Sequence, residues 1–184
     1  MDLIWIVPVS GVVAVLFAMY LMWDVLRRDT GNDRMRDIAD RIMLGAKAFI
    51  SRQYRTIAIL ALVAAVAIAL VLALVTKIPP DINGNGITEG DNADKIGLGW
   101  RTAVAFLVGA FCSGLAGIVG MYVSVKANVR VAAAATRGLG PAVQTAMRGG
   151  AVSGFLIVAL SLLGVTAMFY AFDGNSNPEL APFL

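Results

Sequence analysis

Residues 106–130, FLVGAFCSGLAGIVGMYVSVKANVR, combine two features that decide the fold. Most of the stretch is apolar enough to lie in lipid, yet small residues recur at every fourth place, at Gly109, Ser113 and Gly117. The stretch then ends in the charged residues Lys126 and Arg130. A helix that crosses a bilayer and packs closely on a neighbour is expected to have this pattern, because helices in lipid associate through small residues rather than through the hydrophobic effect.

The composition of the whole chain is that of a membrane protein. Hydrophobic residues make up 59% of its 184 residues, whereas soluble domains contain about 45–50% apolar residues. There is no histidine and Cys112 is the single cysteine, so an intrachain disulfide and a His or Cys zinc site are excluded. The net charge of +3 comes from basic residues that flank apolar runs without interleaved aromatic rings. We therefore expect no nucleic-acid partner.

Four apolar runs are long enough to cross the hydrocarbon core, which takes about 20 helical residues. None of them contains Asp, Glu, Lys or Arg, and Trp or Tyr residues lie near their ends, as at membrane interfaces. The predicted fold is an all-α integral membrane domain that covers residues 1–184, with transmembrane helices at 3–23, 56–75, 102–125 and 151–172. Positive charges follow the first run rather than precede it, which favours a retained helix over a cleaved signal peptide.

The charges between the runs predict the orientation. Segments 24–55 and 126–148 hold most of the Lys and Arg residues, whereas segment 76–100 holds two basic residues against four acids. Neither terminus contains Lys or Arg. The positive-inside rule then predicts that 24–55 and 126–148 are cytoplasmic, and that the outer loop 76–100 and both termini lie outside.

The cytoplasmic segment 33–55 keeps a helical period, so the second helix is expected to begin well before its apolar run. Arg36 and Asp40 lie four residues apart, and so do Asp37 and Arg41. We interpret these pairs as ion pairs on the helix surface rather than as part of a divalent metal site, because the interleaved arginines would fill a cavity shared by the carboxylates.

Small residues also define the faces expected to pack against other helices. One stripe follows the third run, and a second enters the fourth run. Residues four apart lie on one face of a helix, which allows two backbones to approach closely. The predicted packing residues are Gly109, Ser113, Gly117, Gly120, Ser124, Ala142, Ala146, Gly150 and Gly154.

The outer segment DINGNGITEGDN begins like a calcium-binding loop, in which oxygen ligands alternate before a glycine. Asp81, Asn83 and Asn85 fit the start of that pattern, but Asn replaces the closing Glu and Asp91 comes one residue early. A turn rich in Asn and Gly explains the same residues without an ion. A calcium site at these four positions therefore stands as the alternative to a plain turn.

Catalytic motifs are missing from the sequence. It contains no GxxxxGK[ST] phosphate loop, no GxSxG elbow and no HExxH helix. The four runs also have no ionisable side chain of the kind that pumps place at membrane depth. We therefore predict no catalytic or substrate-binding residue here, and a supporting role for the helices.

Three segments resemble a known family. GAKAFISRQYRTI (45–57), FLVGAFCSGLAGIVGMYVSVKANVRVAAAA (106–135) and AVQTAMRGGAVSGFLIVALSLLG (142–164) resemble the second, third and fourth helices of the membrane-bound, ion-pumping inorganic pyrophosphatases. The segments occur in the family's order and with comparable spacing, and they cover most of the chain.

The resemblance implies a much longer, homodimeric protein in the plasma membrane of a bacterium or archaeon. Such proteins hydrolyse pyrophosphate as a Mg2+ complex at the cytoplasmic face and move protons or sodium ions outward. Their substrate site lies on later helices, beginning with the fifth, so no catalytic or magnesium-binding residue carries over to this sequence. The resemblance thus implies an amino-terminal fragment that is surrounded by lipid and by the remaining pump helices.

The residues also allow a different class of function. Four helices without catalytic groups would suit a self-contained membrane protein that acts in assembly or interaction, with calcium bound by the outer loop. The genomic DNA downstream of Leu184 discriminates between the two, because only the pump requires further helices rich in aspartate and lysine.

Overall fold

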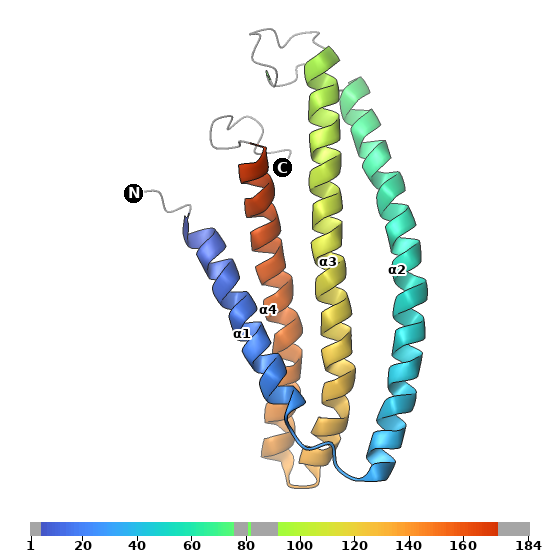
Figure 1. The fold of residues 1–184 in the computed structure, drawn as a ribbon, viewed down its shortest axis with the longest axis vertical. Helices are drawn as coiled ribbons and strands as arrows, with labels where there is room; N and C mark the ends of the chain where they lie inside the picture. Colours follow the sequence, from blue (N-terminus) through green and yellow to red (C-terminus); the bar gives the residue numbers. More distant parts are fainter. Residues whose placement is uncertain (1–4, 76–80, 82–91, 173–184) are drawn as a thin grey trace. The chain divides into compact units, whose positions relative to one another are not determined.

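The computed structural model describes residues 5–75, 81 and 92–172. Figure 1 shows them as long helices joined by short connections and by segments drawn in grey. The helices are α1 (Ile6–Leu26), α2 (Asp33–Val75), α3 (Asn92–Ala135) and α4 (Leu139–Ala171). Each is long and apolar enough to cross a membrane. The predicted all-α fold with four membrane-spanning helices is confirmed.

The chain divides into two compact units. Unit 1 contains residues 1–55 and 112–163, and unit 2 contains residues 56–111 and 164–184. The helix α1 belongs wholly to unit 1, whereas α2, α3 and α4 each contribute one part to either unit. Unit 1 is therefore an assembly of four helical segments.

Two of the helices are much longer than a membrane is thick. The helix α2 has 43 residues, or about 65 Å at 1.5 Å per residue, against about 30 Å of hydrocarbon. It begins at Asp33, so the predicted extension ahead of its apolar run is confirmed. The helix α3 begins at Asn92, inside the segment predicted as the outer loop, because its first turn carries Asp94, which suits a helix N-terminus.

Glycine and asparagine shape the connection between α1 and α2. Gly31 has a φ of 73°, a left-handed backbone conformation that residues other than glycine rarely adopt. The Asp29 carboxylate accepts a hydrogen bond from the Gly31 amide at 3.0 Å. The Asn32 side chain then accepts one from the Met35 amide at 2.9 Å. Asn32 thereby satisfies one of the free N–H groups at the start of α2, as a helix cap does.

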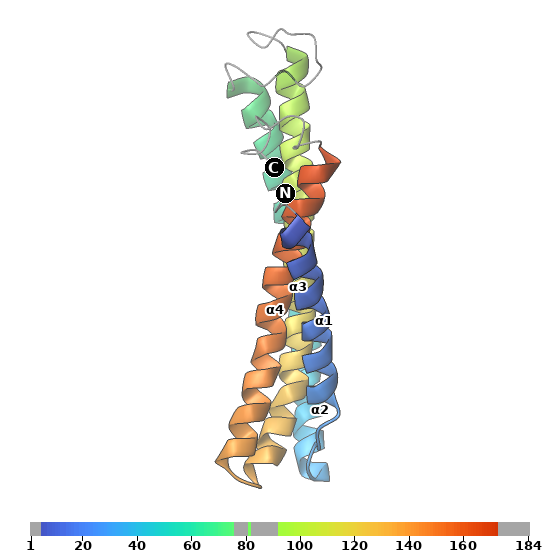
Figure 2. The same ribbon diagram turned by 90° about the vertical axis from the view of Figure 1, so that its left-hand side faces the viewer.

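A tight turn makes α3 and α4 neighbours in unit 1, as Figures 1 and 2 show. Gly138 has a φ of 135°, and Pro141 lies in the first turn of α4, where its missing N–H costs nothing. The Thr136 hydroxyl donates to the Ala133 carbonyl at 2.7 Å and so uses a free acceptor at the end of α3.

Most buried positions of α1, α3 and α4 in unit 1 recur at alternating steps of three and four, with an occasional step of seven, whereas Met43, Val129 and Ala133 are buried outside this pattern. We call this set of positions the seam: Gly11, Ala18, Leu21 and Val25 on α1, Ala116, Gly120, Val123, Ala127, Arg130 and Ala134 on α3, and Ala142, Thr145, Gly149, Val152 and Ala159 on α4. Such spacing averages 3.5 residues and keeps one face of each helix against its neighbours. Leu21, Val123 and Val152 meet in one hydrophobic cluster.

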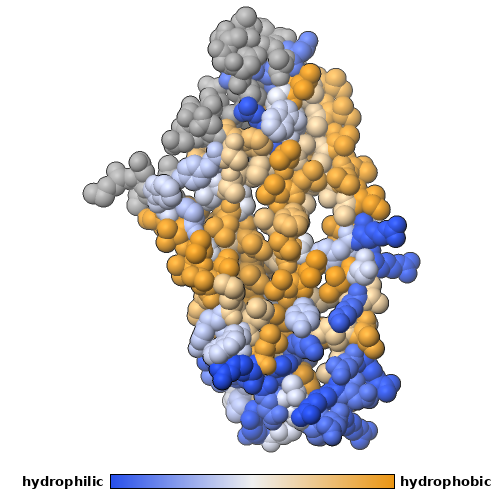
Figure 3. Space-filling model, in the orientation of Figure 1, coloured by the Kyte–Doolittle hydropathy of each residue, from blue (hydrophilic) through white to orange (hydrophobic). Residues whose placement is uncertain are grey.

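Many large apolar side chains are exposed on all four helices. Leu74 is 80% exposed and Trp5 is 67% exposed. Figure 3 shows a broad apolar face, with charged side chains gathered where α1 ends and α2 begins. An exposed apolar surface of this extent marks contact with lipid or with further helices.

Candidate functional site at the charged end of unit 1

Polar side chains gather at one end of unit 1, where α1 stops and where α3 turns into α4. We call this region the charged end, and it comprises Asp24, Arg28, Arg130, Thr145 and Arg148. The residues come from α1, from the loop that follows it, from α3 and from α4. They are adjacent only because the helices bring them together.

Asp24 joins α1 to α4. Its Oδ2 atom accepts hydrogen bonds from Arg28 at 2.9 Å and from Arg148 at 2.7 Å. Arg28 also donates to the Thr145 hydroxyl at 2.7 Å, and that hydroxyl donates to the Pro141 carbonyl. The three charged side chains are only 21–34% exposed, so water screens these ion pairs less than it screens pairs on an open surface.

Arg130 joins α3 to α1. It is 9% exposed, and its terminal nitrogens donate to the Lys126 carbonyl at 2.6 Å and to the Leu26 carbonyl at 2.8 Å. Leu26 is the last residue of α1, so its carbonyl lacks a partner within the helix. A positive group also suits the negative end of the helix dipole. Arg130 therefore caps α1 from a different helix.

The charge of Arg130 has no counter-ion in the part of the chain that the structure describes. None of the observed ion pairs includes Arg130, and its Nε atom makes no hydrogen bond to a described residue. A buried charge without a partner is unfavourable, because it gives up water and gains little in return. The surroundings of Arg130 therefore favour an anion.

A pocket of about 200 Å³ opens beside Arg130, between the first turns of α2 and the end of α3. Its walls carry three cations and one carboxylate, together with apolar side chains. The lining residues are Thr30, Arg36, Ala39, Asp40, Met43, Val125, Lys126, Val129 and Arg130. We call it the α2–α3 pocket.

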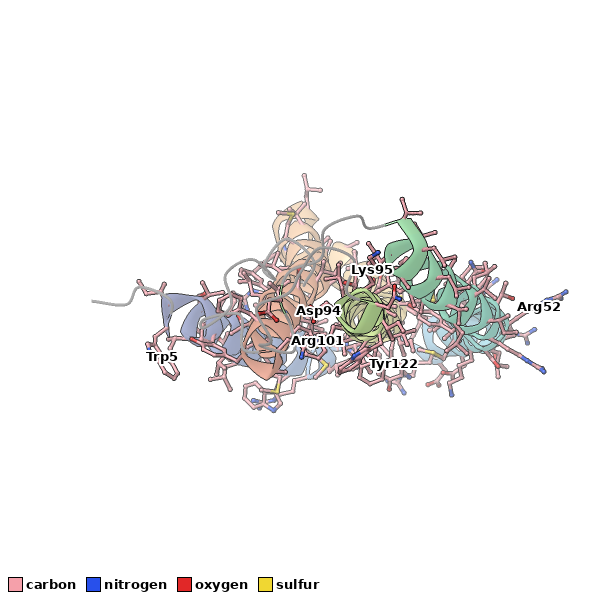
Figure 4. All side chains as sticks on the ribbon, turned by 90° about the horizontal axis from the view of Figure 1, so that it is seen from above. Trp5, Arg52, Asp94, Lys95, Arg101 and Tyr122 are labelled. Carbon is pink, nitrogen blue, oxygen red and sulfur yellow. The ribbon has the colours of Figure 1, made fainter. Side chains whose placement is uncertain are left out.

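Unit 2 contains a separate polar position on α3. Asp94 is fully buried in the first turn of the helix, and Arg101 lies seven residues later. The Arg101 guanidinium lies 5.8 Å from the centroid of the Trp100 ring and 5.7 Å from that of Phe172. Figure 4 labels Asp94 and Arg101. From the sequence, Asp94 was interpreted only as one of the acidic residues of the outer loop, so its burial was not predicted.

Comparison with known protein families shows to which family the chain belongs. A family model described as inorganic H+ pyrophosphatase matches residues 12–183. The chain belongs to this family. It is 48% identical over 182 residues to the K(+)-insensitive pyrophosphate-energized proton pump 2 of Moorella thermoacetica. The aligned region makes up 99% of the chain and 23% of the relative. The resemblance that the sequence carries to the ion-pumping pyrophosphatases is thus confirmed.

Two further relatives agree. K(+)-insensitive pyrophosphate-energized proton pumps from Caldanaerobacter subterraneus subsp. tengcongensis and Chloroflexus aurantiacus are both 40% identical, over 91% and 96% of the chain and 22% of each relative. The chain therefore spans less than a quarter of the length of these relatives and corresponds to their amino-terminal part. No solved structure matches the chain. As a family member with four such helices, it is an integral membrane protein.

Within this pyrophosphatase chain, two of the predicted packing glycines lie at helix contacts. A Cβ atom added to Gly120 would come within 2.7 Å of the Ser153 Oγ atom and 3.7 Å of the Ser153 Cα atom. Gly117 faces the hydroxyl of Tyr54 on α2. Ala142 is also buried.

The other predicted packing residues face outward in this chain. An added Cβ at the glycines among them would have no neighbour within 4 Å, and the Ser and Ala side chains are exposed. They are Gly109, Ser113, Ser124, Ala146, Gly150 and Gly154. Each step of four residues rotates by about 40° around a helix, so a stripe with that spacing leaves the face that the seam keeps. Their contact with helices outside the chain stays a prediction.

The sequence predicted that Gly150 packs against another helix, whereas in the structure Gly149 makes the contact between α4 and α3. A Cβ atom added to Gly149 would lie 2.9 Å from the Cβ atom of Ala127. Both residues belong to the seam, and the alternation of three and four among small residues is the signal that would have found them.

One predicted ion pair is wrong and one is confirmed. Arg36 does not pair with Asp40, because its side chain turns toward the start of α2, as helical side chains tend to do. There it donates to the Gly31 carbonyl at 3.0 Å and to the Thr30 hydroxyl at 3.1 Å. Arg41 pairs with Asp37 at 3.1 Å, as predicted.

Metal ligands are scarce in the described residues. No three His, Cys, Asp or Glu side chains come together there. Of the calcium candidates, Asn83, Asn85 and Asp91 lie outside the described residues, and Asp81 alone is described. Calcium binding by the outer loop stays a prediction.

Proposed function

We propose that the chain forms the amino-terminal helices of a pyrophosphate-energised proton pump, and that these helices support the pump without catalysing its reaction. The observation that carries the proposal is the family match over residues 12–183. The relatives are named as K(+)-insensitive proton pumps, so we propose protons rather than sodium ions as the transported species.

The supporting role rests on what the polar residues do. Hydrolysis of a diphosphate needs a group that positions water and metal ions that neutralise the phosphate charge. At the charged end, Arg28 and Arg148 both donate to the Asp24 carboxylate, and the terminal nitrogens of Arg130 donate to backbone carbonyls. These groups hold helices together. Among the described residues, no three acidic side chains form a cluster that could bind Mg2+.

We further propose that the whole protein is a magnesium-dependent homodimer in a bacterial or archaeal plasma membrane. The remaining pump helices would then cover part of the apolar surface that this chain exposes. The outward-facing small residues of α3 and α4 suit such contacts, because they allow close approach of another backbone.

Sealed vesicles test the proposal. One preparation holds the protein with all of the chain that its gene encodes, and the other holds residues 1–184 alone. After addition of magnesium pyrophosphate, phosphate release and the internal pH are followed together. We expect the first preparation to release phosphate and acidify the vesicle interior, and the second to do neither. Hydrolysis by residues 1–184 alone would overturn the supporting role.

The transported ion is tested in the same vesicles. Replacing all sodium by choline should leave acidification unchanged if protons are pumped, whereas loss of pyrophosphate hydrolysis without sodium would overturn that assignment. Potassium should have no effect. A protonophore serves as the control, since it should abolish acidification while hydrolysis continues.

A further inference from the structure

We propose that the α2–α3 pocket is a binding site for a phosphate group carried by an anionic ligand. The inference does not depend on the proposed function. It rests on the charge, burial and size of the pocket.

The first wall of the pocket belongs to α3. Lys126 and Arg130 lie four residues apart and therefore on the same side of the helix. Arg130 is nearly buried, and its two bonds to the carbonyls of Lys126 and Leu26 fix its position. The Lys126 ammonium forms no ion pair with any described carboxylate. Two positive charges thus lie side by side without an ion-pair partner among the described residues.

The second wall belongs to the start of α2 and the loop before it. Arg36 lies there with its guanidinium held by the Thr30 hydroxyl and the Gly31 carbonyl. Asp40 is the one acid among the lining residues. Arg36 pairs with Asp33, which lies outside the lining, and not with Asp40. Asp40 forms no ion pair within the described part of the chain. Three cations therefore face one carboxylate.

Phosphate is the anion that this arrangement suits best. Arginine donors in a fixed geometry match phosphate oxygens, and a lysine adds a point charge. Because the positions of Arg36 and Arg130 are already fixed, binding would cost little side-chain entropy. The volume of about 200 Å³ corresponds to roughly seven water molecules at about 30 Å³ each, which is room for one phosphate group with some of its water.

Two sources could supply the phosphate. Basic pockets between membrane helices bind the head groups of anionic lipids, and soluble phosphate or pyrophosphate carries the same group. The apolar side chains of Val125, Val129 and Met43 lie in the same pocket, where they would contact the glycerol or acyl part of a lipid.

The experiment compares two matched variants, Lys126→Gln in the pocket and Lys47→Gln on an exposed position of α2 outside it. Each is made in the protein with all of the chain that its gene encodes. Phosphatidylglycerol retained after detergent extraction is counted by native mass spectrometry. Inorganic phosphate is titrated into the delipidated protein by calorimetry. A third variant, Asp40→Asn, removes the acid of the pocket.

We expect Lys126→Gln to weaken phosphatidylglycerol binding about fivefold, the effect of one basic residue at a membrane surface, and Asp40→Asn to strengthen it. A loss of lipid binding alone assigns the pocket to a head group, and a loss of inorganic phosphate binding assigns it to a soluble anion. If Lys126→Gln and Asp40→Asn match Lys47→Gln in both measurements while melting temperatures are unchanged, the proposal is wrong.

Discussion

The small and apolar residues of the seam join the helices of unit 1 differently from the polar residues of the charged end, of which Arg130 and Thr145 also occupy seam positions. Along the seam, Gly120 lies against Ser153 and Gly149 lies against Ala127, so contact depends on small size. At the charged end, Arg130 donates to the Leu26 carbonyl of α1 at 2.8 Å, and Asp24 accepts from Arg148 of α4 at 2.7 Å. Shape therefore stabilises one region, and directed polar contacts stabilise the other.

The difference follows from the surroundings of each region. Within hydrocarbon, apolar side chains gain nothing by leaving lipid, so helices associate where their backbones can approach closely. At a helix end, by contrast, the last carbonyls have no partner within the helix and need donors from elsewhere. A small residue cannot serve there, but an arginine can.

The largest effect is expected from breaking the seam by Gly120→Leu. The new side chain would meet Ser153, whose Cα atom lies only 3.7 Å from an added Cβ atom, so α3 and α4 must separate. Overpacking of this kind costs about 3 kcal/mol, seen as a lower melting temperature of residues 1–184 in detergent.

Gly154→Leu is the matched control for that change, because no heavy atom lies within 4 Å of an added Cβ at Gly154. It should leave the melting temperature of residues 1–184 unchanged. Equal destabilisation by the two variants would contradict the seam. In the protein with its complete chain, destabilisation by Gly154→Leu would confirm a contact with further helices.

Arg130→Met should have the next largest effect, because it removes the donors that cap α1. Hydrogen bonds from a charged donor contribute about 1.5–3 kcal/mol, and relief of the buried charge offsets part of their loss. We expect a net loss of about 2 kcal/mol in the unfolding free energy, measured by denaturation in detergent. Arg130→Lys should recover only part of this, since an ammonium does not span both carbonyls. A variant as stable as the native chain would remove the capping role.

Asp24→Asn should have a smaller effect. The change removes the charge that Arg28 and Arg148 share but keeps an oxygen acceptor at the same place. The difference in melting temperature from the native chain should shrink as salt rises from 0.05 to 0.5 M, roughly the range over which the Debye length shortens. The effect of Gly120→Leu should not change with salt. A salt dependence of both variants, or of neither, would undermine the contrast between the two regions.

Arg41→Gln should have the smallest effect of all. Its partner Asp37 is four residues away on α2, and both side chains are more than 60% exposed. Exposed pairs of this type contribute little, because water screens them and both side chains lose freedom. No measurable change in melting temperature is expected, and a clear decrease would show that α2 depends on surface charge.

Much of the fold follows from the sequence because its signals are local. Four apolar runs without charge predict four spanning helices, and the helical period before Thr56 predicts the early start of α2. The family could likewise be recognised from the sequence, because the resemblance lies in contiguous segments. The extension of α3 beyond its apolar run to Asn92 was not predicted, because hydropathy marks only the apolar part of a helix and polar residues such as Asn92 and Asp94 can continue it.

The site was less predictable because it depends on contacts between helices. Arg130 was counted only as a positive charge of a loop, and nothing in its neighbours along the chain announces burial against the carbonyl of Leu26. Asp24 and Arg148 are 124 positions apart. The choice of Gly149 over Gly150 likewise depends on the face that α4 turns toward α3, which the spacing of three and four defines.

This seam sets how α3 packs on α4, and an engineered disulfide between the two helices can show whether it does. With Cys112→Ser as background, Ala127→Cys is combined with Gly149→Cys or with Gly150→Cys, and oxidation within one chain is measured by gel mobility. The Cβ positions at 127 and 149 lie close together, and a disulfide needs close Cβ atoms. We expect rapid cross-linking with Gly149→Cys and little with Gly150→Cys. Cross-linking through position 150 instead of 149 would contradict the seam and restore the simple stripe of every fourth residue.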